Sequence, residues 1–316
     1  MYYLGVDLGG TNIACAVVTR EGDLLGKSSI PTQLPDTPQA IAARISECRL
    51  LAVEATGCTM ADISSVGIGT PGIANSRDGV VEYSCNLGFS NTPLSQLVGD
   101  ILQKPVYLEN DANAAALGEF VAGSGRGSSS LVAITLGTGV GGGVVMNGHL
   151  LTGFNFAGAE IGHFVMVQDG EPCTCGRNGC FEAYCSATAL IRQTRQAMEQ
   201  HPRSLMWQEA GTLEQVSGRT AFDAMRLGDE TAKAVVDQYI RHLACGLTSI
   251  VNIFQPEVLC VGGGICNEGE TLLAPVREIF DREDYARDCT RRTSILRATL
   301  GNDAGIIGAA LLPLYR

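Results

Sequence analysis

The chain opens, from Tyr2 to Ile30, with YYLGVDLGGTNIACAVVTREGDLLGKSSI, and this stretch decides the fold. Apolar residues dominate Tyr2–Leu8, a Gly9-Gly10 turn follows, and Asn12–Thr19 is again mostly apolar. A second glycine-containing turn leads into Leu24–Ile30. Short apolar runs separated by glycine turns are typical of antiparallel strands, so a three-stranded meander is predicted at the N-terminus.

The same pattern returns in the middle of the chain, so a meander followed by helices occurs twice, near residue 2 and near residue 130. The further predicted elements are a helix from Pro38, strands at Val66–Gly69 and Val106–Leu108, a helix at Ala112–Val121, strands at Leu131–Leu136 and Val144–Asn147, a helix at Ala232–Phe254, a strand at Glu257–Val261 and a closing helix at Ala304–Leu314. We therefore expect an α/β fold with two related lobes facing a cleft. Residues 1–111 would form the N-terminal lobe, with a helix at about 304–316 packing back on it, and residues 112–303 the C-terminal lobe.

Composition narrows the class of protein. The chain has 316 residues, of which 45% are hydrophobic and 17% charged, so it can bury more than one core. The formal net charge is -11 and no lysine- or arginine-rich run occurs, which argues against nucleic acid and anionic membranes as partners. The N-terminus lacks the regions of a signal peptide and no apolar stretch approaches membrane-spanning length, so we expect a cytoplasmic protein.

Three glycine-rich stretches follow predicted strands. In Asp7–Asn12, backbone amides and the Thr11 hydroxyl can hold phosphate oxygens, and Asp7 can orient hydrated Mg²⁺. Gly137–Gly143 has more glycines than a turn needs, which indicates close approach of a phosphate, although it matches neither a Walker A loop nor a dinucleotide loop. Gly262–Gly264 leaves bare backbone for an adenine ring. The first and third stretches also fit an ordinary turn or loop.

One histidine and three cysteines form the most specific pattern in the chain: His163, Cys173, Cys175 and Cys180. In a cytoplasmic protein such a cluster points to a metal before a disulfide. The spacing and the intervening glycines fit a tetrahedral Cys₃His zinc site, and four protein ligands make such a site closed and structural. The alternative is four unrelated reduced side chains.

Acidic residues lie beside these motifs. Asp111 follows a predicted strand at the start of a predicted helix, where an ionised carboxylate is stabilised and can accept a hydrogen bond from a sugar hydroxyl. The alternative is a helix N-cap, and one aspartate can serve as both. Glu160 and Glu182 flank the cysteine cluster and can accept hydrogen bonds from sugar hydroxyls; the alternative for both is a surface carboxylate.

Together these motifs resemble the ROK family of sugar kinases and repressors, over nearly the whole chain. Asp7–Asn12 and Leu136–Gly143 are similar to the two phosphate loops of the family, and Glu160–His163 with Cys173–Glu182 is a combination specific to it. The resemblance implies a two-lobed, actin-like (ribonuclease-H-like) fold with ATP between the lobes. It also implies a homodimer or homotetramer.

The resemblance further implies an ATP-dependent hexose kinase, with glucose phosphorylated at its 6-hydroxyl and Asp111 as the general base. The implied sugar contacts are Gly72, Asn86, Asn110, Asp111, Gly139, Glu160, His163 and Glu182. The implied nucleotide contacts are Asp7, Gly9, Gly10, Thr11, Asn12, Thr138, Gly139, Gly141, Gly262, Gly263 and Gly264. The implied cofactors are Mg²⁺ bound with ATP and a structural zinc on His163, Cys173, Cys175 and Cys180.

Two departures from the family pattern bear on substrate and nucleotide. Asn12 stands where many members carry lysine, and Phe89 stands where glucose kinases place tryptophan. N-acetylmannosamine kinase is the first alternative, because those kinases share every motif named here, and fructokinase is the second. A sugar-sensing regulator without catalysis is an alternative of another class, although the intact Asp111 and both phosphate loops argue against it. Only six residues precede Asp7, so we expect no DNA-binding domain ahead of it.

The metal and the sugar are expected to be coupled. If one ring nitrogen of His163 binds zinc, the other becomes an N–H donor that can face a sugar hydroxyl. Loss of zinc should then raise the KM for the sugar strongly. The KM for ATP should change much less, because both phosphate loops lie elsewhere in the sequence.

Overall fold

The computed structural model describes residues 1–315, and the chain divides into two compact units. The first unit comprises Met1–Ala133, Gly142–Ala159 and residues 298–315; the second comprises Ile134–Gly141 and Glu160–Arg297. Two strands, β9 (Ser130–Leu136) and β10 (Val140–Met146), carry the chain from one unit into the other. The first unit therefore extends beyond Asp111, where the sequence placed the boundary.

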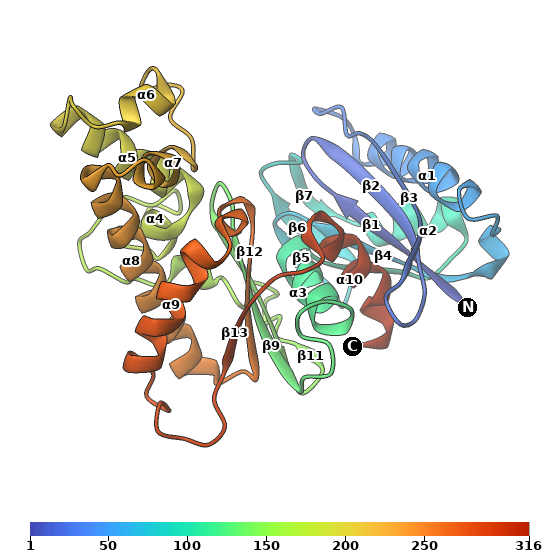
Figure 1. Ribbon diagram of the computed structural model, residues 1–316. Coiled ribbons are helices and arrows are strands. Elements are labelled where there is room, and N and C mark those ends of the chain that lie inside the picture. The colour runs from blue at the N-terminus through green and yellow to red at the C-terminus, as the bar shows by residue number, and fades with distance from the viewer. Residues whose placement is uncertain (316) are drawn as a thin grey trace. The chain divides into compact units, whose positions relative to one another are not determined.

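The main sheet of the first unit has the order β3-β2-β1-β4-β8. Figure 1 labels β1, β2, β3 and β4 of this sheet. Its strands are β1 (Tyr2–Leu8), β2 (Asn12–Val18), β3 (Leu24–Pro31), β4 (Ile63–Thr70) and β8 (Val106–Asn110). The first three pair antiparallel, which confirms the predicted meander, whereas β1, β4 and β8 run parallel. The carboxyl ends of β1, β4 and β8 therefore share one edge of the sheet, where the predicted site residues Asp7, Asn110 and Asp111 lie.

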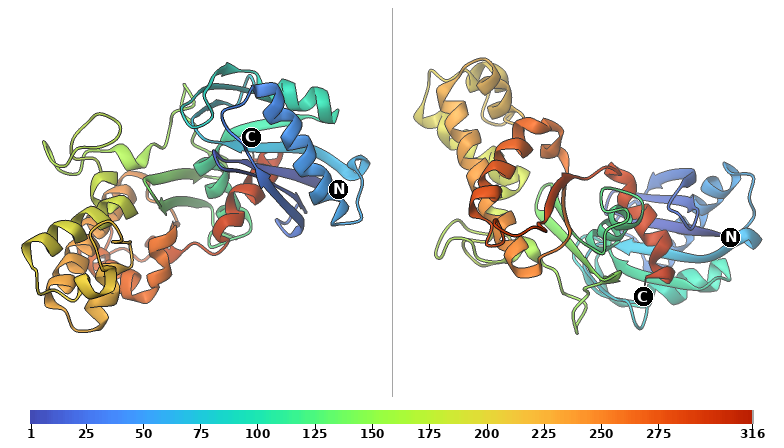
Figure 2. Two further views of the ribbon diagram at one scale, coloured as in Figure 1. Left: turned by 90° about the horizontal axis from the view of Figure 1, so that it is seen from above. Right: turned by 60° about the horizontal axis from the view of Figure 1, so that its bottom comes forward.

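Helices cover both faces of this sheet, as the two views of Figure 2 also show. The helices are α1 (Pro38–Glu54) and α2 (Leu94–Leu102) on one face, and α10 (Ala304–Leu311) beside α3 (Asp111–Val121) on the other. Leu4 and Val6 of β1 lie in one buried cluster with α1 and α2. Tyr3 lies in another cluster with α10. This alternation is the period-two pattern of a strand with a core on each face.

Two glycines bring α3 and α10 into backbone contact. A Cβ atom on Gly118 would lie 2.1 Å from the Ala304 carbonyl oxygen, and one on Gly308 would lie 1.7 Å from the Ala114 carbonyl oxygen. Any larger residue at these positions would force the helices apart. This close crossing is the physical reason that α3 belongs to the first unit. The predicted closing helix is α10, followed by the 3₁₀ turn η5 (Leu312–Leu314).

A small antiparallel sheet in the first unit was not predicted. It consists of β5 (Ile73–Asn75), β6 (Val80–Ser84) and β7 (Phe89–Thr92). These strands are short and carry polar residues, so they lack the apolar runs on which the sequence prediction depends. The β6–β7 turn carries Asn86, so the small sheet positions a predicted sugar contact.

The second sheet has the order β11-β10-β9-β12-β13. Its remaining strands are β11 (His149–Leu150), β12 (Val258–Gly262) and β13 (Ser294–Arg297). If the five strands of each main sheet are numbered along the chain, both sheets have the spatial order third, second, first, fourth, fifth. The shared strand order confirms the repeat that the sequence predicted.

Helices make up most of the second unit. They are α4 (Glu182–Cys185), α5 (Ala187–Gln200), α6 (Met206–Ala210), α7 (Thr220–Arg226), α8 (Glu230–Phe254) and α9 (Glu270–Glu283), with short 3₁₀ turns η2 (Ile161–His163) and η3 (Gly264–Glu268). Two further 3₁₀ turns, η1 (Met60–Asp62) and η4 (Gly301–Asp303), lie in the first unit. Within residues 1–315, no helix has both the length and the apolar character needed to cross a membrane.

The predicted glycine loop at Gly137–Gly143 is shorter than expected. Only Gly137–Gly139 lie outside strands, and β10 already begins at Val140. Gly143 belongs to the strand: a Cβ atom there would lie 2.5 Å from the Ala116 Cβ and 2.8 Å from the Ala112 carbonyl oxygen. This glycine therefore admits α3 against β10 and is not evidence for a ligand.

Candidate active site

In the first unit, the turn from Gly9 to Asn12 is held from behind by Thr32. The buried Thr32 hydroxyl donates to the Gly9 carbonyl oxygen at 2.7 Å, and the Thr32 amide donates to the Thr11 carbonyl oxygen at 2.8 Å. The C=O and N–H groups of a trans peptide point in opposite directions, so the Gly10 amide points away from Thr32. Gly10, Thr11 and Asn12 are exposed, and an outward amide of this kind suits a phosphate oxygen. Thr32 was missed by the sequence prediction.

Asp7 precedes this turn and lies next to the start of α10. A Cβ atom on Gly305 would lie 3.6 Å from Asp7 Oδ2. Burial raises the pKa of Asp7, and the positive charge of Lys27 opposes that rise. The protein therefore only partly offsets the cost of a buried negative charge on Asp7, and a hydrated Mg²⁺ ion beside this carboxylate would offset more of it.

Asn110, and not Asp111, caps α3. Asn110 Oδ1 accepts hydrogen bonds from the Ala112 and Asn113 amides at 2.9 and 3.2 Å, and Asn110 Nδ2 donates to the Gly72 carbonyl oxygen at 3.1 Å. Buried Glu109 supports this arrangement by accepting from the Asn110 amide. The exposed Asp111 is the first residue of the helix, and its Oδ1 also accepts from the Ala112 amide at 2.8 Å.

Asn86 is exposed in the β6–β7 turn and lies beside the 9–12 turn. A Cβ atom on Gly10 would lie 3.7 Å from the Asn86 Cβ. The first unit thus brings a predicted sugar contact next to a predicted nucleotide contact. Asn110 and Gly72 are joined by the hydrogen bond described above, so these predicted sugar contacts also lie together.

In the second unit, the N-terminus of α5 holds the 137–140 turn. The Ala187 amide donates to the Gly137 carbonyl oxygen at 2.8 Å, and the Thr188 hydroxyl donates to the Thr138 carbonyl oxygen at 2.8 Å. Because both carbonyl groups point toward α5, the amides of Thr138 and Gly139 in the same two peptides point away from it. Two neighbouring amides directed the same way form a suitable cradle for a phosphate.

Glu182 closes the other end of this turn. Its Oε2 accepts from the Val140 amide at 2.8 Å, and a Cβ atom on Gly139 would lie 2.2 Å from the same oxygen. Its Oε1 accepts from the Thr174 hydroxyl at 3.0 Å and from the Cys173 thiol at 3.6 Å. Glu182 therefore joins the cysteine loop, Cys173–Cys180, to the 137–140 turn. The two elements are separate in sequence but adjacent in space, contrary to the reasoning that zinc loss would spare ATP binding.

The turn η2 carries His163, and Glu160 precedes it as the N-cap. Glu160 is exposed at the start of η2, and a Cβ atom on Gly162 would lie 2.2 Å from the Val140 carbonyl oxygen. Gly162 therefore lets η2 pack directly against the end of the 137–140 turn. Glu182 accepts from the amide of the same Val140, so the predicted residues Glu160 and Glu182 lie in the same part of the second unit.

The four predicted metal ligands converge. The ligand atoms of His163, Cys173, Cys175 and Cys180 all lie within 4.8 Å of one another. His163 Nδ1 lies 3.6 Å from Cys173 Sγ, and Cys175 Sγ lies 3.6 Å from Cys180 Sγ. Two sulfur ligands at about 2.3 Å in tetrahedral geometry are about 3.8 Å apart, so the spacing and the donor set fit zinc.

The third glycine stretch lies at the end of β12. Gly262 ends the strand, Gly263 has a φ of 94°, and Gly264 begins η3. A Cβ atom on Gly264 would meet no atom within 4 Å, and Gly264 is exposed. The backbone here is therefore accessible to a flat ring. Gly141, by contrast, lies inside β10 and not in a loop.

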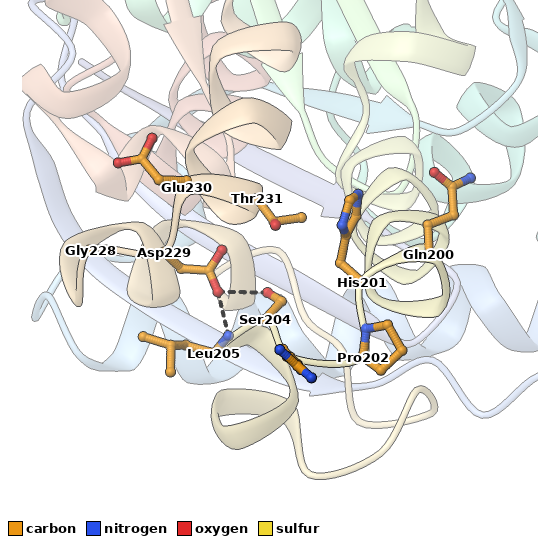
Figure 3. Close-up of a pocket in the computed structure, with 10 residues that line it drawn as sticks. Gln200, His201, Pro202, Ser204, Leu205, Gly228, Asp229, Glu230 and Thr231 are labelled. Atoms are coloured by element: carbon orange, nitrogen blue, oxygen red, sulfur yellow. Dashed lines mark hydrogen bonds between the residues drawn. The ribbon is translucent and has the colours of Figure 1, made fainter.

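A separate pocket of about 460 Å³ lies at the N-terminus of α8 (Figure 3). Asp229 at its centre accepts hydrogen bonds from Ser204 and Leu205 and caps α8 through the Ala232 amide. Burial acts to raise the pKa of Asp229, but these hydrogen bonds outweigh burial and lower it. The Asp229 carboxylate is occupied in stabilising the helix, and no predicted site residue lines this pocket.

Comparison with known proteins settles the family. The family described as "ROK family" matches residues 3–315. The chain belongs to the ROK family. This ROK protein is 40% identical to a glucokinase of Thermotoga maritima over 309 aligned residues. The aligned region covers 97% of this chain and 95% of the relative.

Two solved structures agree with this assignment. A ROK family glucokinase from Streptomyces griseus, in complex with glucose and AMPPNP, is 36% identical, with a TM-score of 0.80 and 99% of each chain covered. A ROK hexokinase from Thermus thermophilus is 34% identical, with a TM-score of 0.83, 98% of this chain covered and 97% of that chain. This ROK protein therefore has the α/β sugar kinase fold of the family, with mixed sheets, and the predicted resemblance is confirmed.

Proposed function

We propose that this ROK protein is an ATP-dependent glucokinase that transfers the γ-phosphoryl group of ATP to the 6-hydroxyl of glucose. Similarity to glucokinases over nearly the full length of both chains supports the activity. The observation that carries the chemistry is the exposed carboxylate of Asp111 at the N-terminus of α3, whose capping is done by Asn110. A hexose kinase needs such an acceptor for the proton of the attacking hydroxyl.

In the proposed reaction, Asp111 accepts the proton of the 6-hydroxyl as its oxygen attacks the γ-phosphorus. A bond forms between that oxygen and phosphorus, the bond between the γ-phosphorus and the bridging oxygen breaks, and ADP leaves. The Ala112 amide donates to Asp111 Oδ1 at 2.8 Å, which restricts the carboxylate and favours one orientation toward the hydroxyl. Most of the rate enhancement in phosphoryl transfer comes from positioning and charge neutralisation.

The nucleotide contacts follow from the two turns. The Gly10 amide in the first unit, and the Thr138 and Gly139 amides in the second, are proposed to hold phosphate oxygens. Thr11 and Asn12 are exposed beside Gly10 and are proposed to contact the same groups. Mg²⁺ bound with ATP would neutralise phosphate charge, with Asp7 orienting its hydration shell. The accessible backbone at Gly262–Gly264 is proposed to lie against the adenine ring.

The proposed sugar contacts are those of the sequence prediction: Gly72, Asn86, Asn110, Gly139, Glu160, His163 and Glu182, with Asp111 at the reacting hydroxyl. Asn110 Nδ2 has two hydrogens, of which one is on the Gly72 carbonyl, so the second can meet a sugar oxygen. A carboxylate has about four lone-pair positions. Glu182 can therefore accept a sugar hydroxyl in addition to its protein donors.

We propose a structural zinc on His163, Cys173, Cys175 and Cys180. Since His163 Nδ1 faces Cys173 Sγ, Nδ1 is the proposed ligand atom and Nε2 is left protonated as a donor for the sugar. Four protein ligands leave no open position, so the metal would stabilise the loop and take no part in bond breaking.

A coupled ADP-release assay over glucose, fructose, mannose, N-acetylglucosamine and N-acetylmannosamine tests the proposal. Glucose should give the highest kcat/KM. A higher value for N-acetylmannosamine or fructose would replace glucose as the substrate. Sugar binding by calorimetry without turnover on any sugar would instead support a sugar-sensing regulator.

Two coarser properties belong to the same proposal. Because ATP is the proposed phosphoryl donor, the proposed compartment is the cytoplasm. The resemblance to the family supports a homodimer or homotetramer, and light scattering coupled to size-exclusion chromatography would distinguish these from a monomer.

A further inference from the structure

Three contacts hold the 137–140 turn to the helices behind it. Two of them come from the N-terminus of α5, where Ala187 and Thr188 contact the carbonyl groups of the turn. This helix end is itself fixed, because Ser186 Oγ accepts from the Ala189 amide at 3.0 Å. The third contact is the Glu182 carboxylate on the Val140 amide. The position of the Glu182 carboxylate depends in turn on its other contacts.

Those remaining contacts come from the cysteine loop. Glu182 Oε1 accepts from the Thr174 hydroxyl at 3.0 Å and from the Cys173 thiol at 3.6 Å. Zinc binds cysteine as the thiolate, and a thiolate has no proton to donate to a carboxylate. With zinc on Cys173, that residue would no longer donate to the carboxylate, and the Thr174 hydroxyl would still donate to Oε1.

The Glu182 carboxylate and the turn also touch directly. The position of a Cβ atom on Gly139 would be 2.2 Å from Glu182 Oε2, so the carboxylate fills the space that any other side chain at residue 139 would need. A shift of Glu182 is thus transmitted to Gly139 and to the Val140 amide. These residues adjoin the Thr138 and Gly139 amides that are proposed to bind phosphate.

We propose that Thr174 is a positioning residue for the nucleotide, acting through Glu182 on the 137–140 turn. The cysteine loop would then set the affinity for ATP and not only its own stability. This inference rests on the proposed kinase function. Thr174 is exposed, and one hydrogen bond makes a modest net contribution to folding stability. A purely structural role therefore predicts a small loss of stability and no change in the KM or Kd for ATP.

The test uses Thr174→Val, which removes the hydroxyl at nearly constant shape, and Thr174→Ser, which keeps it. Thr212→Val is the matched control, because Thr212 is also an exposed threonine of the second unit. Each full-length, zinc-loaded protein would be measured for kcat, for the KM values of ATP and glucose, and for bound zinc. Calorimetry with ATP and Mg²⁺, without sugar, would give the nucleotide Kd.

Thr174→Val should raise the KM and the Kd for ATP about three- to tenfold, the range for one lost hydrogen bond, with kcat and zinc content near the parent values. Thr174→Ser and Thr212→Val should behave like the parent. Parent-like ATP values for Thr174→Val would overturn the inference, and so would a rise confined to the KM for glucose or a loss of zinc. If the parent phosphorylates no sugar, the proposed function fails, while the calorimetric Kd still tests Thr174.

Discussion

Replacing Asp111 with asparagine separates catalysis from binding and folding. Asparagine keeps the shape and one acceptor oxygen of the aspartate, so the contact from the Ala112 amide at 2.8 Å can persist. It cannot accept the proton of the attacking hydroxyl. Loss of a general base costs about 10²–10⁴ in rate, which corresponds to about 2.7–5.4 kcal/mol on the barrier. We expect kcat to fall by that factor.

The structure also limits the effect of Asp111→Asn on stability. Asn110 caps α3, so the cap is untouched by the change. What is lost is a negative charge in the first turn of a helix, worth about 0.3–1 kcal/mol at an exposed position. In a protein with units of this size, that loss lowers the Tm by less than about 4 °C.

The assay for Asp111→Asn is coupled ADP release at saturating glucose and ATP, with glucose binding followed by calorimetry and the Tm by scanning calorimetry. Asp100→Asn is the matched control, since Asp100 is an exposed aspartate on α2 of the same unit. The expected result is a large loss of kcat with glucose binding and Tm retained. A variant with kcat within about tenfold of the parent would remove Asp111 from the role of general base.

Three further predictions test the metal site and two buried carboxylates. Elemental analysis should find one zinc per chain in the parent and none in Cys175→Ser. The same variant should have a higher KM for ATP as well as for glucose. Parent protein purified without zinc would contradict the proposed zinc site. Glu119→Gln should lower the free energy of unfolding by about 1–3 kcal/mol, because buried Glu119 accepts hydrogen bonds from the amides of a neighbouring loop and of the segment before α10. The control Glu47→Gln, at an exposed position in α1, should leave the free energy of unfolding unchanged. Equal urea midpoints for Glu119→Gln and the parent would refute this prediction. Asp229→Ala should cost about 0.5–2 kcal/mol at pH 7 by removing the N-cap of α8. Because hydrogen bonds lower the pKa of Asp229, its stabilisation is complete above the ordinary pKa of about 3.9 and lost as pH falls below it, so the two unfolding curves should converge at low pH; a gap that stays constant down to pH ~2 would contradict this.

The sequence alone determined the features that depend on near neighbours in the chain. The meander from Tyr2 to Ile30 follows from the order of apolar residues and glycine turns, and β1, β2 and β3 lie where that order predicted them. The convergence of His163 with the three cysteines was also predictable, because Cys173, Cys175 and Cys180 are close in sequence. The strand β12 and the helix α8 were found for the same reason.

Tertiary structure alone decided how these pieces meet. Glu182 and Val140 are separated by 42 residues, yet one hydrogen bond joins them and links the cysteine loop to the 137–140 turn. Buried Thr32 supports Gly9 from a distance of 23 residues. Gly143 was interpreted as part of a phosphate loop, and it instead makes room for α3. A sequence pattern reports which side chains are nearby along one element. The contacts between elements depend on how the sheet and helices pack. In a closely packed interior, the space at each residue is set by atoms of other elements, which the local sequence does not show.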